Sequence, residues 1–242
     1  MKSETFLSNL KAIAPHHDRS TVFNAFVLLA ACAFSAQTRE AEYLDEAKRW
    51  TKEELTGFSH ALGALIIDME ADPFTDVLGV VYTEYAQSKG TRERGGEFYT
   101  PPNVSRLMAQ MLAGSYEGDS TEPITLCEPA CGAGGMILAF AEALSPNARR
   151  RLRVTAIDIS RTACHMAFIN TTLWGIPARI HHANALSNEF WASWSNIHYL
   201  APWLHPGACA SVPDFPEQGA PASPIEVKAI SAALGQQELG LD

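Results

Sequence analysis

A glycine-rich segment after a short apolar run is the part of the sequence best suited to bind a ligand. It covers residues 128–135 and reads E-P-A-C-G-A-G-G. Glycines permit positive φ angles and let the backbone approach a ligand closely, and a helix start beyond them offers free N–H groups. The spacing matches neither a G-x-G-x-x-G fingerprint nor a phosphate loop. The segment therefore predicts a ligand-binding loop without fixing the ligand, and Cys131 within it is expected to be a packing residue.

Two polar side chains at the ends of later strands extend this prediction. Asp158 ends a predicted strand at residues 153–158, and a carboxylate roughly 20–30 residues after such a loop commonly accepts the hydroxyls of a ribose. SAM (S-adenosyl-L-methionine) and NAD fit this pattern equally well, and an ordinary acid at a helix start is the alternative. Asn184 follows a strand at residues 178–182, where its amide is placed to read an adenine edge or to form a turn.

The elements expected around these residues alternate between strand and helix. A further short strand is predicted at residues 124–127, and Ser160 is expected to cap a helix that stops at Gly175. This order implies right-handed βαβ units and a parallel sheet. Before the first strand, Thr100-Pro101-Pro102 predicts the start of a helix. Its expected apolar face consists of Val104, Leu107, Met108, Met111 and Leu112.

The first ninety or so residues are expected to be helical, with their apolar stripes packed in a core. Residues 22–36 form one apolar helix, and Thr51 with Glu54 has the spacing of a capping box. Another helix is expected to start at Asp72-Pro73, with Val77, Val80, Val81 and Tyr85 along one face. The charged, glycine-rich connection at residues 89–96 is the natural boundary between this helical part and the alternating strands and helices.

Three segments together resemble a known family. Residues 96–101 are similar to a G-x-F-[YF]-T-P segment, residues 128–135 to a D-P-A-C-G-S-G-G loop, and residues 76–82 to a D-x-L-G-x-x-Y-E helix. All three are typical of adenine-specific (N-6) DNA methyltransferases, in particular of the methylase subunit of type I restriction–modification systems. They occur here in the family's order and at similar spacing.

The resemblance implies a fold, a cofactor and partners. The fold is a class I SAM-dependent methyltransferase with a Rossmann-like parallel sheet, preceded by an all-helical N-terminal domain. We expect the helical domain at residues 1–94, the SAM-binding domain at residues 95–210 and an irregular proline-rich tail with a possible terminal helix at residues 211–242. The implied cofactor is SAM, and the implied partners are DNA and a specificity or methylase subunit.

The resemblance also assigns roles to single residues, and no metal site is among them. The methionine end of SAM is expected along Tyr99, Thr100 and Pro101. The loop expected to hold the cofactor contributes Glu128, Pro129, Ala130, Gly132 and Gly134. Asp158 is expected to bind the ribose, and Asn184 is expected to lie near the adenine.

One departure from the family concerns its catalytic tetrad, Asn/Asp-Pro-Pro-Tyr/Phe, which orients the target amine and stacks on the flipped base. No N-P-P occurs in this sequence, and the nearest candidate pair is Asn196 with Tyr199, after residues 189–195, which give no clean apolar strand. Three hypotheses stay open: an active enzyme with an unusual or partner-completed site, a non-catalytic SAM-binding relative, and a methyltransferase acting on protein or a small molecule. The family match disfavours the third.

Charge and composition limit these hypotheses. The net charge of −9 and the pI near 5.4 exclude a protein that coats nucleic acid by bulk charge. Contact with DNA would need a local basic patch or a partner subunit. The five cysteines include no C-x-x-C, which suits a reducing compartment. Because residues 22–36 are shorter than the roughly 20 apolar residues of a spanning helix, the cytoplasm is the expected location.

Overall fold

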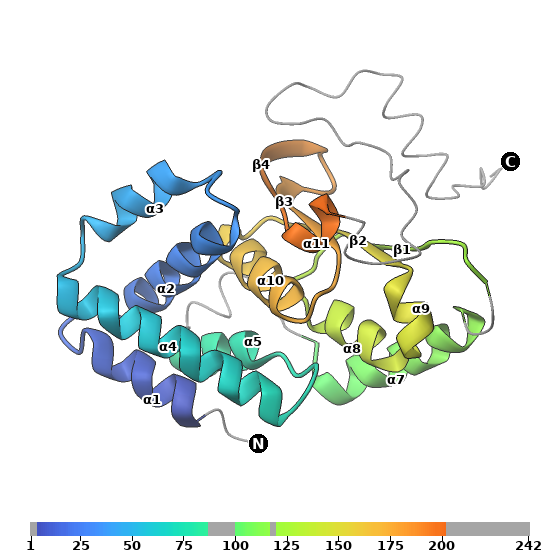
Figure 1. Ribbon diagram of the computed structural model, residues 1–242, viewed down its shortest axis with the longest axis horizontal. Helices are drawn as coiled ribbons and strands as arrows, with labels where there is room; N and C mark the ends of the chain where they lie inside the picture. Colours follow the sequence, from blue (N-terminus) through green and yellow to red (C-terminus); the bar gives the residue numbers. More distant parts are fainter. Residues whose placement is uncertain (1–3, 87–99, 117–119, 202–242) are drawn as a thin grey trace, which may run out of the picture.

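The N-terminal part of the protein is helical, as the sequence predicts. The computed structural model describes residues 4–86, 100–116 and 120–201 (Figure 1). The first of these ranges contains α1 (Glu4–Ile13), α2 (Arg19–Phe34), α3 (Glu40–Ala47), α4 (Lys52–Ala71), α5 (Val77–Val81) and a π-helical turn (Tyr82–Ala86).

Side-chain caps fix where these helices begin. Thr51 and Glu54 form the predicted capping box at the start of α4, each accepting a hydrogen bond from the other's backbone N–H. The helix expected from Asp72 begins later, at Val77, because the side chain of Asp76 accepts a hydrogen bond from Gly79 N at 2.8 Å and acts as the N-cap. The predicted start at Asp72 is therefore wrong by about one turn.

The remaining elements form an α/β region. In chain order they are α7 (Pro102–Ala113), a 3-10 turn (Gly114–Tyr116), β1 (Ile124–Glu128), α8 (Gly135–Ala143), α9 (Pro146–Arg150), β2 (Leu152–Asp158), α10 (Arg161–Leu173), β3 (Ala178–Asn184), β4 (Glu189–Ser195) and α11 (Ile197–Leu200). The strands lie side by side in the order β1-β2-β3-β4. The parallel βαβ units therefore form as predicted.

The sheet differs from the prediction in its last strand. β1, β2 and β3 are parallel, but β4 runs antiparallel to β3 and pairs Ile180 with Trp194. The four residues between the two strands include Asn188 at φ +55°, a left-handed conformation that asparagine tolerates better than most residues. The sheet is thus mixed, and residues 189–195, which gave no clean strand signal, form a hairpin with β3.

The apolar face predicted for α7 is not the face that the helix buries. Val104 and Met111 are exposed, the latter by 76%, and so are Leu107, Met108 and Leu112. The helix instead buries Ser105, Ala109 and Ala113, and it packs on α8. Small residues allow two helices to approach closely, so this contact needs no large side chains.

The helical and α/β regions share one hydrophobic core. Helix α10 packs against β2, β3 and α8, and α2 packs on α10, so α10 lies between the N-terminal helices and the sheet (Figure 1). The predicted boundary between residues 94 and 95 and the predicted tail lie outside the described residues, and the domain limits stay a prediction. Within the described part of the chain, no helix is both long and apolar enough to cross a membrane.

Candidate functional site

The glycine loop connects β1 to α8 and is held in place by α10 and β2. Gly132 and Gly134 have φ angles of +53° and +88°, which glycine adopts without the steric penalty of a Cβ atom. Gly134 also lies close to α10, because a Cβ placed on it would be 3.5 Å from Ala167 Cα. Cys131 N donates to Ile157 O at 2.9 Å. Burial raises the pKa of the Cys131 thiol well above its usual range, which fits the predicted packing role.

Asp158 lies at the end of β2 and faces this loop. One of its carboxylate oxygens accepts a hydrogen bond from Gly132 N and the other from Ser160 N, both at 2.8 Å. A carboxylate oxygen has two acceptor positions. Each oxygen of Asp158 can therefore still accept one hydroxyl hydrogen from a ligand that lies across the loop.

Asn184 ends the neighbouring strand β3 and serves the turn that the sequence had left as its alternative role. Its Oδ1 accepts hydrogen bonds from Leu186 N at 3.0 Å and Ser187 N at 3.2 Å. No described residue accepts a hydrogen bond from its Nδ2 in this structure. Fixing the oxygen in the turn orients the amide, so its NH₂ group can donate to a ring nitrogen of a bound base.

A cavity of about 420 Å³ lies over these strand ends, and we call it the larger cavity. Six of the residues predicted to bind the cofactor line it: Thr100, Pro129, Ala130, Gly132, Asp158 and Asn184. Its volume falls within the range usual for sites of small organic ligands. Pro101, Glu128 and Gly134 do not line it, and Tyr99 lies outside the described residues.

Glu128 is half-buried at the end of β1, behind the loop. Its Oε1 accepts a long hydrogen bond, 3.4 Å, from Ala130 N. Burial raises the pKa of the Glu128 carboxyl, and the negative charge of Asp158 raises it further, against the lowering effect of the Ala130 N–H. The described contacts thus make Glu128 a support of the loop.

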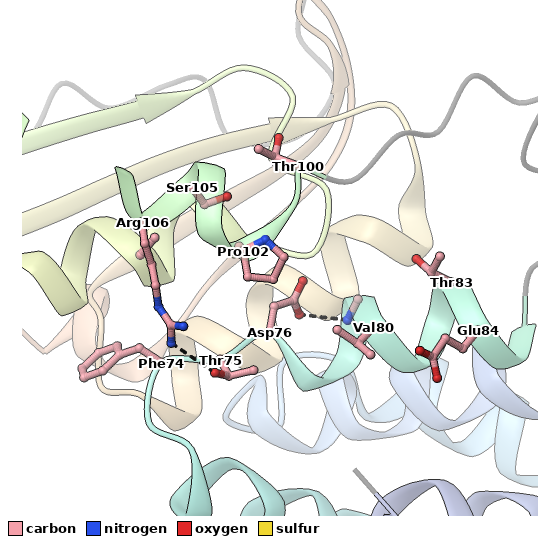
Figure 2. A pocket seen from close by; sticks show the side chains of 13 residues that line it. Phe74, Thr75, Asp76, Val80, Thr83, Glu84, Thr100, Pro102, Ser105 and Arg106 are labelled. Atoms are coloured by element: carbon pink, nitrogen blue, oxygen red, sulfur yellow. Dashed lines mark hydrogen bonds between the residues drawn. The ribbon is translucent and has the colours of Figure 1, made fainter. Parts of the chain in front are cut away.

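A second, smaller cavity of about 200 Å³ adjoins the first, and Figure 2 shows its lining. The two cavities share four lining residues: Asp76, Thr100, Ser105 and Gly135. The shared wall is built from the start of α5, the start of α7 and the first residue of α8. The two spaces therefore meet where three helices begin.

Asp76 is the acidic residue of this wall, and the sequence prediction missed it. Its Oδ1 accepts hydrogen bonds from Gly79 N at 2.8 Å and from Asn170 Nδ2 at 3.0 Å, and Asn170 also donates to Ala133 O. Burial raises the pKa of the Asp76 carboxyl, and these two donors lower it by less. The sequence signal that could have indicated Asp76 is the D-V-L-G segment at residues 76–79. This segment carries part of the family resemblance but by itself suggests no function for Asp76.

The comparison with known proteins places this geometry in a family. Residues 69–203 match the family model described as N-6 DNA methylase. The chain belongs to the N-6 DNA methylase family. It is also 27% identical, over 123 residues, to the "Type I restriction enzyme MpnII methylase subunit" of Mycoplasma pneumoniae. The aligned part is 50% of this chain but only 22% of that relative. The family resemblance predicted from three sequence segments is confirmed.

The candidate for this family's tetrad lies apart from the two cavities. Asn196 is 0% exposed and caps α11 by accepting a hydrogen bond from Tyr199 N at 2.9 Å. The same amide accepts from Ala178 N at 3.2 Å and donates to Ile176 O at 2.7 Å. Neither Asn196 nor Tyr199 lines either cavity. Their predicted catalytic role stays a prediction, while the described contacts of Asn196 are structural.

One group of described side chains has the composition of a metal site. The ligand atoms of His16, His17 and Glu54 lie within 4.8 Å of one another, at the start of α4. His16 Nε2 and Glu54 Oε1 are 3.5 Å apart. None of the three lines either cavity, so they are no part of the candidate cofactor site.

Proposed function

We propose that this chain binds SAM in the larger cavity and forms the cofactor-binding part of an enzyme that methylates the exocyclic amine of adenine in DNA. The observation that carries the proposal is the cavity itself, where the glycine loop, Asp158 and Asn184 meet at the ends of three neighbouring parallel strands. Membership of the N-6 DNA methylase family supports this choice over NAD, which the sequence pattern alone had left open.

The order of the strands suggests how the cofactor lies. A nucleoside bound along the ends of β1, β2 and β3 passes the glycine loop, then Asp158 and then Asn184. Asp158 would accept the two ribose hydroxyls, and the Asn184 amide would donate to the adenine. The methionine part would then point toward Thr100 and Gly135, which also line the larger cavity.

The chemistry divides between the cofactor and the chain. When bound, SAM supplies a methyl group on a sulfonium sulfur that an amine nitrogen can attack. The chain would hold the cofactor through Asp158 and through the glycine loop that leads into α8. The acceptor amine would need a hydrogen-bond acceptor of its own, which the family takes from its tetrad. DNA itself would be reached through a local patch or a specificity or methylase partner, given the net charge of −9.

A second candidate function is that of a SAM-binding methylase homologue that is non-catalytic by itself and acts as a regulatory or partner-dependent subunit. The observation that favours it is Asn196, whose amide is fully buried and already makes three hydrogen bonds to the backbone. A side chain held in this way cannot turn to a substrate amine without leaving those groups unpaired. The sequence also contains no N-P-P.

Two measurements on the full chain test these proposals. Calorimetry with SAM should show binding at a single site, and absence of binding would refute the SAM proposal. Transfer of a tritiated methyl group to unmethylated DNA should then be measured with the chain alone and with a type I methylase subunit added. Labelled DNA in the first reaction supports the enzyme, labelled DNA in the second alone supports partner dependence, and label in neither supports the non-catalytic subunit.

A further inference from the structure

The wall between the two cavities holds a carboxylate with one unused oxygen. Asp76 Oδ1 is engaged by Gly79 and Asn170, but no described residue donates a hydrogen bond to Oδ2. This oxygen lies close to the backbone at Gly79 and Gly135, since a Cβ placed on Gly79 would overlap it and one on Gly135 would be 3.6 Å from it. The glycines thus leave room for the carboxylate beside the first residue of α8. In the view of Figure 2, Pro102 lies between Asp76 and the side chains of Ser105 and Thr100.

A buried hydroxyl without a partner lies in the same wall. Ser105 is 2% exposed, and its Oγ makes no hydrogen bond in this structure. A buried polar atom left unpaired is unfavourable, so such atoms call for an explanation. Ser105 lines both cavities, and a polar group of a ligand at their junction would satisfy it.

The charges around the wall favour a cation at Asp76. Among the described residues, no lysine, arginine or histidine forms an ion pair with Asp76. The arginine of the smaller cavity, Arg106, donates to Glu142 at 2.9 Å and to Thr75 Oγ1 at 3.4 Å. Asp76 is partly buried, and a carboxylate partly withdrawn from water without a cationic partner is unfavourable until a positive ligand group supplies one.

We propose that Asp76 binds the α-ammonium group of the methionine part of SAM at the junction of the two cavities, with the Ser105 hydroxyl donating to the α-carboxylate. The inference rests on the proposed SAM site and extends it past the ribose and adenine. The nucleoside end occupies the larger cavity, and the amino-acid end reaches the shared wall. Asp76 is thereby a further SAM-binding residue, in addition to the glycine loop and Asp158.

Glu84 is another carboxylate of the smaller cavity and gives a matched control, because it is exposed on the π-helical turn. Asp76→Asn keeps an oxygen that can accept from Gly79 and Asn170 and removes only the negative charge. Glu84→Gln removes a charge of the same kind at the competing position.

The test compares SAM with 5′-methylthioadenosine, which keeps the nucleoside and the sulfur but lacks the amino-acid part. Asp76→Asn should weaken SAM binding by at least about tenfold, the scale of one charge-assisted hydrogen bond, and leave 5′-methylthioadenosine binding unchanged. Asp158→Ala should weaken both ligands. Glu84→Gln should change the ratio of the two affinities by less than about twofold, well below that one-bond scale.

The outcomes separate this inference from the proposal on which it rests. Binding of neither ligand to the wild-type chain overturns both. If Asp158→Ala weakens the binding of both ligands while Asp76→Asn binds SAM normally, only the role of Asp76 is overturned. The role of Asp76 is also overturned if Asp76→Asn loses the same affinity for both ligands. If that variant does not fold, the wild-type chain decides: S-adenosylhomocysteine should bind at least about tenfold more tightly than its deaminated analogue, and equal affinities refute the inference.

Discussion

The carboxylate of Asp158 and the backbone N–H of Gly132 are joined by a 2.8 Å hydrogen bond that ties the end of β2 to the glycine loop after β1. The acid therefore has two tasks in the proposed site. It holds the loop in the shape that the cavity needs, and it keeps acceptor positions for the ribose.

Removing that carboxylate should affect both tasks. In Asp158→Ala, we expect SAM affinity to fall at least about tenfold, because charge-assisted hydrogen bonds of roughly 1.5–3 kcal/mol each are lost. The free energy of unfolding should fall by about 1–2 kcal/mol, since Gly132 N and Ser160 N lose their acceptor. Calorimetry and urea unfolding measure the two effects. Unchanged SAM binding in a folded variant would show that the site is elsewhere.

The left-handed glycine of the loop gives a second prediction. In Gly134→Ala, the φ of +88° becomes unfavourable by about 1–2 kcal/mol, although the new Cβ would meet Ala167 only at an ordinary contact distance. Stability should fall by that amount, and SAM should bind more weakly because the loop shifts. Gly63→Ala is the control: Gly63 lies in α4 with nothing within 4 Å of a new Cβ.

That control should act in the opposite direction. Alanine is favoured over glycine inside a helix by roughly 0.5–1 kcal/mol, so Gly63→Ala should stabilise the chain in urea and leave SAM binding unchanged. Equal stability changes in the two variants would mean that the positive φ angle of Gly134 does not cause the loss of stability in Gly134→Ala.

The contact between the N-terminal helices and α10 predicts that the α/β region does not stand alone. Besides the packing of α2 on α10, Arg161 pairs with Glu42, Thr162 Oγ1 donates to Asn24 at 3.1 Å, and Arg39 donates to Ser193 O at 2.7 Å. A chain that starts at residue 95 would expose the apolar surface beneath α2 and should be poorly soluble. Its soluble fraction on expression, compared with the full chain, checks this. A truncated chain that unfolds cooperatively would contradict it.

The part of the site that depends on strand order was predictable. The carboxyl ends of parallel strands meet at one edge of a sheet, so a loop after β1, an acid after β2 and an amide after β3 had to come together. No such rule predicts the position of Asp76 in the shared wall. Its position depends on how α5 packs against the start of α8, and the spacing and types of residues in the sequence do not reveal this packing.

Two of the three errors in the fold have physical causes of the same kind. The apolar stripe of α7 gives the period of the helix but not the neighbour that covers it, and α8 contacts the side with Ala109 and Ala113 instead. In β4, the pairing with β3 shifts register between His182 and Ala183 and leaves Trp191 as an extra residue, and such a bulge interrupts the regular alternation of side chains along a strand. Only the pairing with β3 reveals it.

The last prediction separates a structural from a catalytic role for Asn196. Replacing it with alanine would leave Ala178 N, Tyr199 N and Ile176 O without partners at a fully buried position. The free energy of unfolding should therefore fall by about 2–4 kcal/mol, and Tyr199→Phe is the matched control because it leaves the Asn196 amide untouched. SAM affinity, measured well below the unfolding temperature of the variant, should stay at the wild-type value, since Asn196 does not line the cavity.

A catalytic asparagine would behave differently: its loss would lower methyl transfer by on the order of a hundredfold or more with little change in stability. If the wild-type chain methylates DNA and Asn196→Ala stays stable while losing that activity, the tetrad assignment is right and the structural role inferred from these hydrogen bonds is wrong.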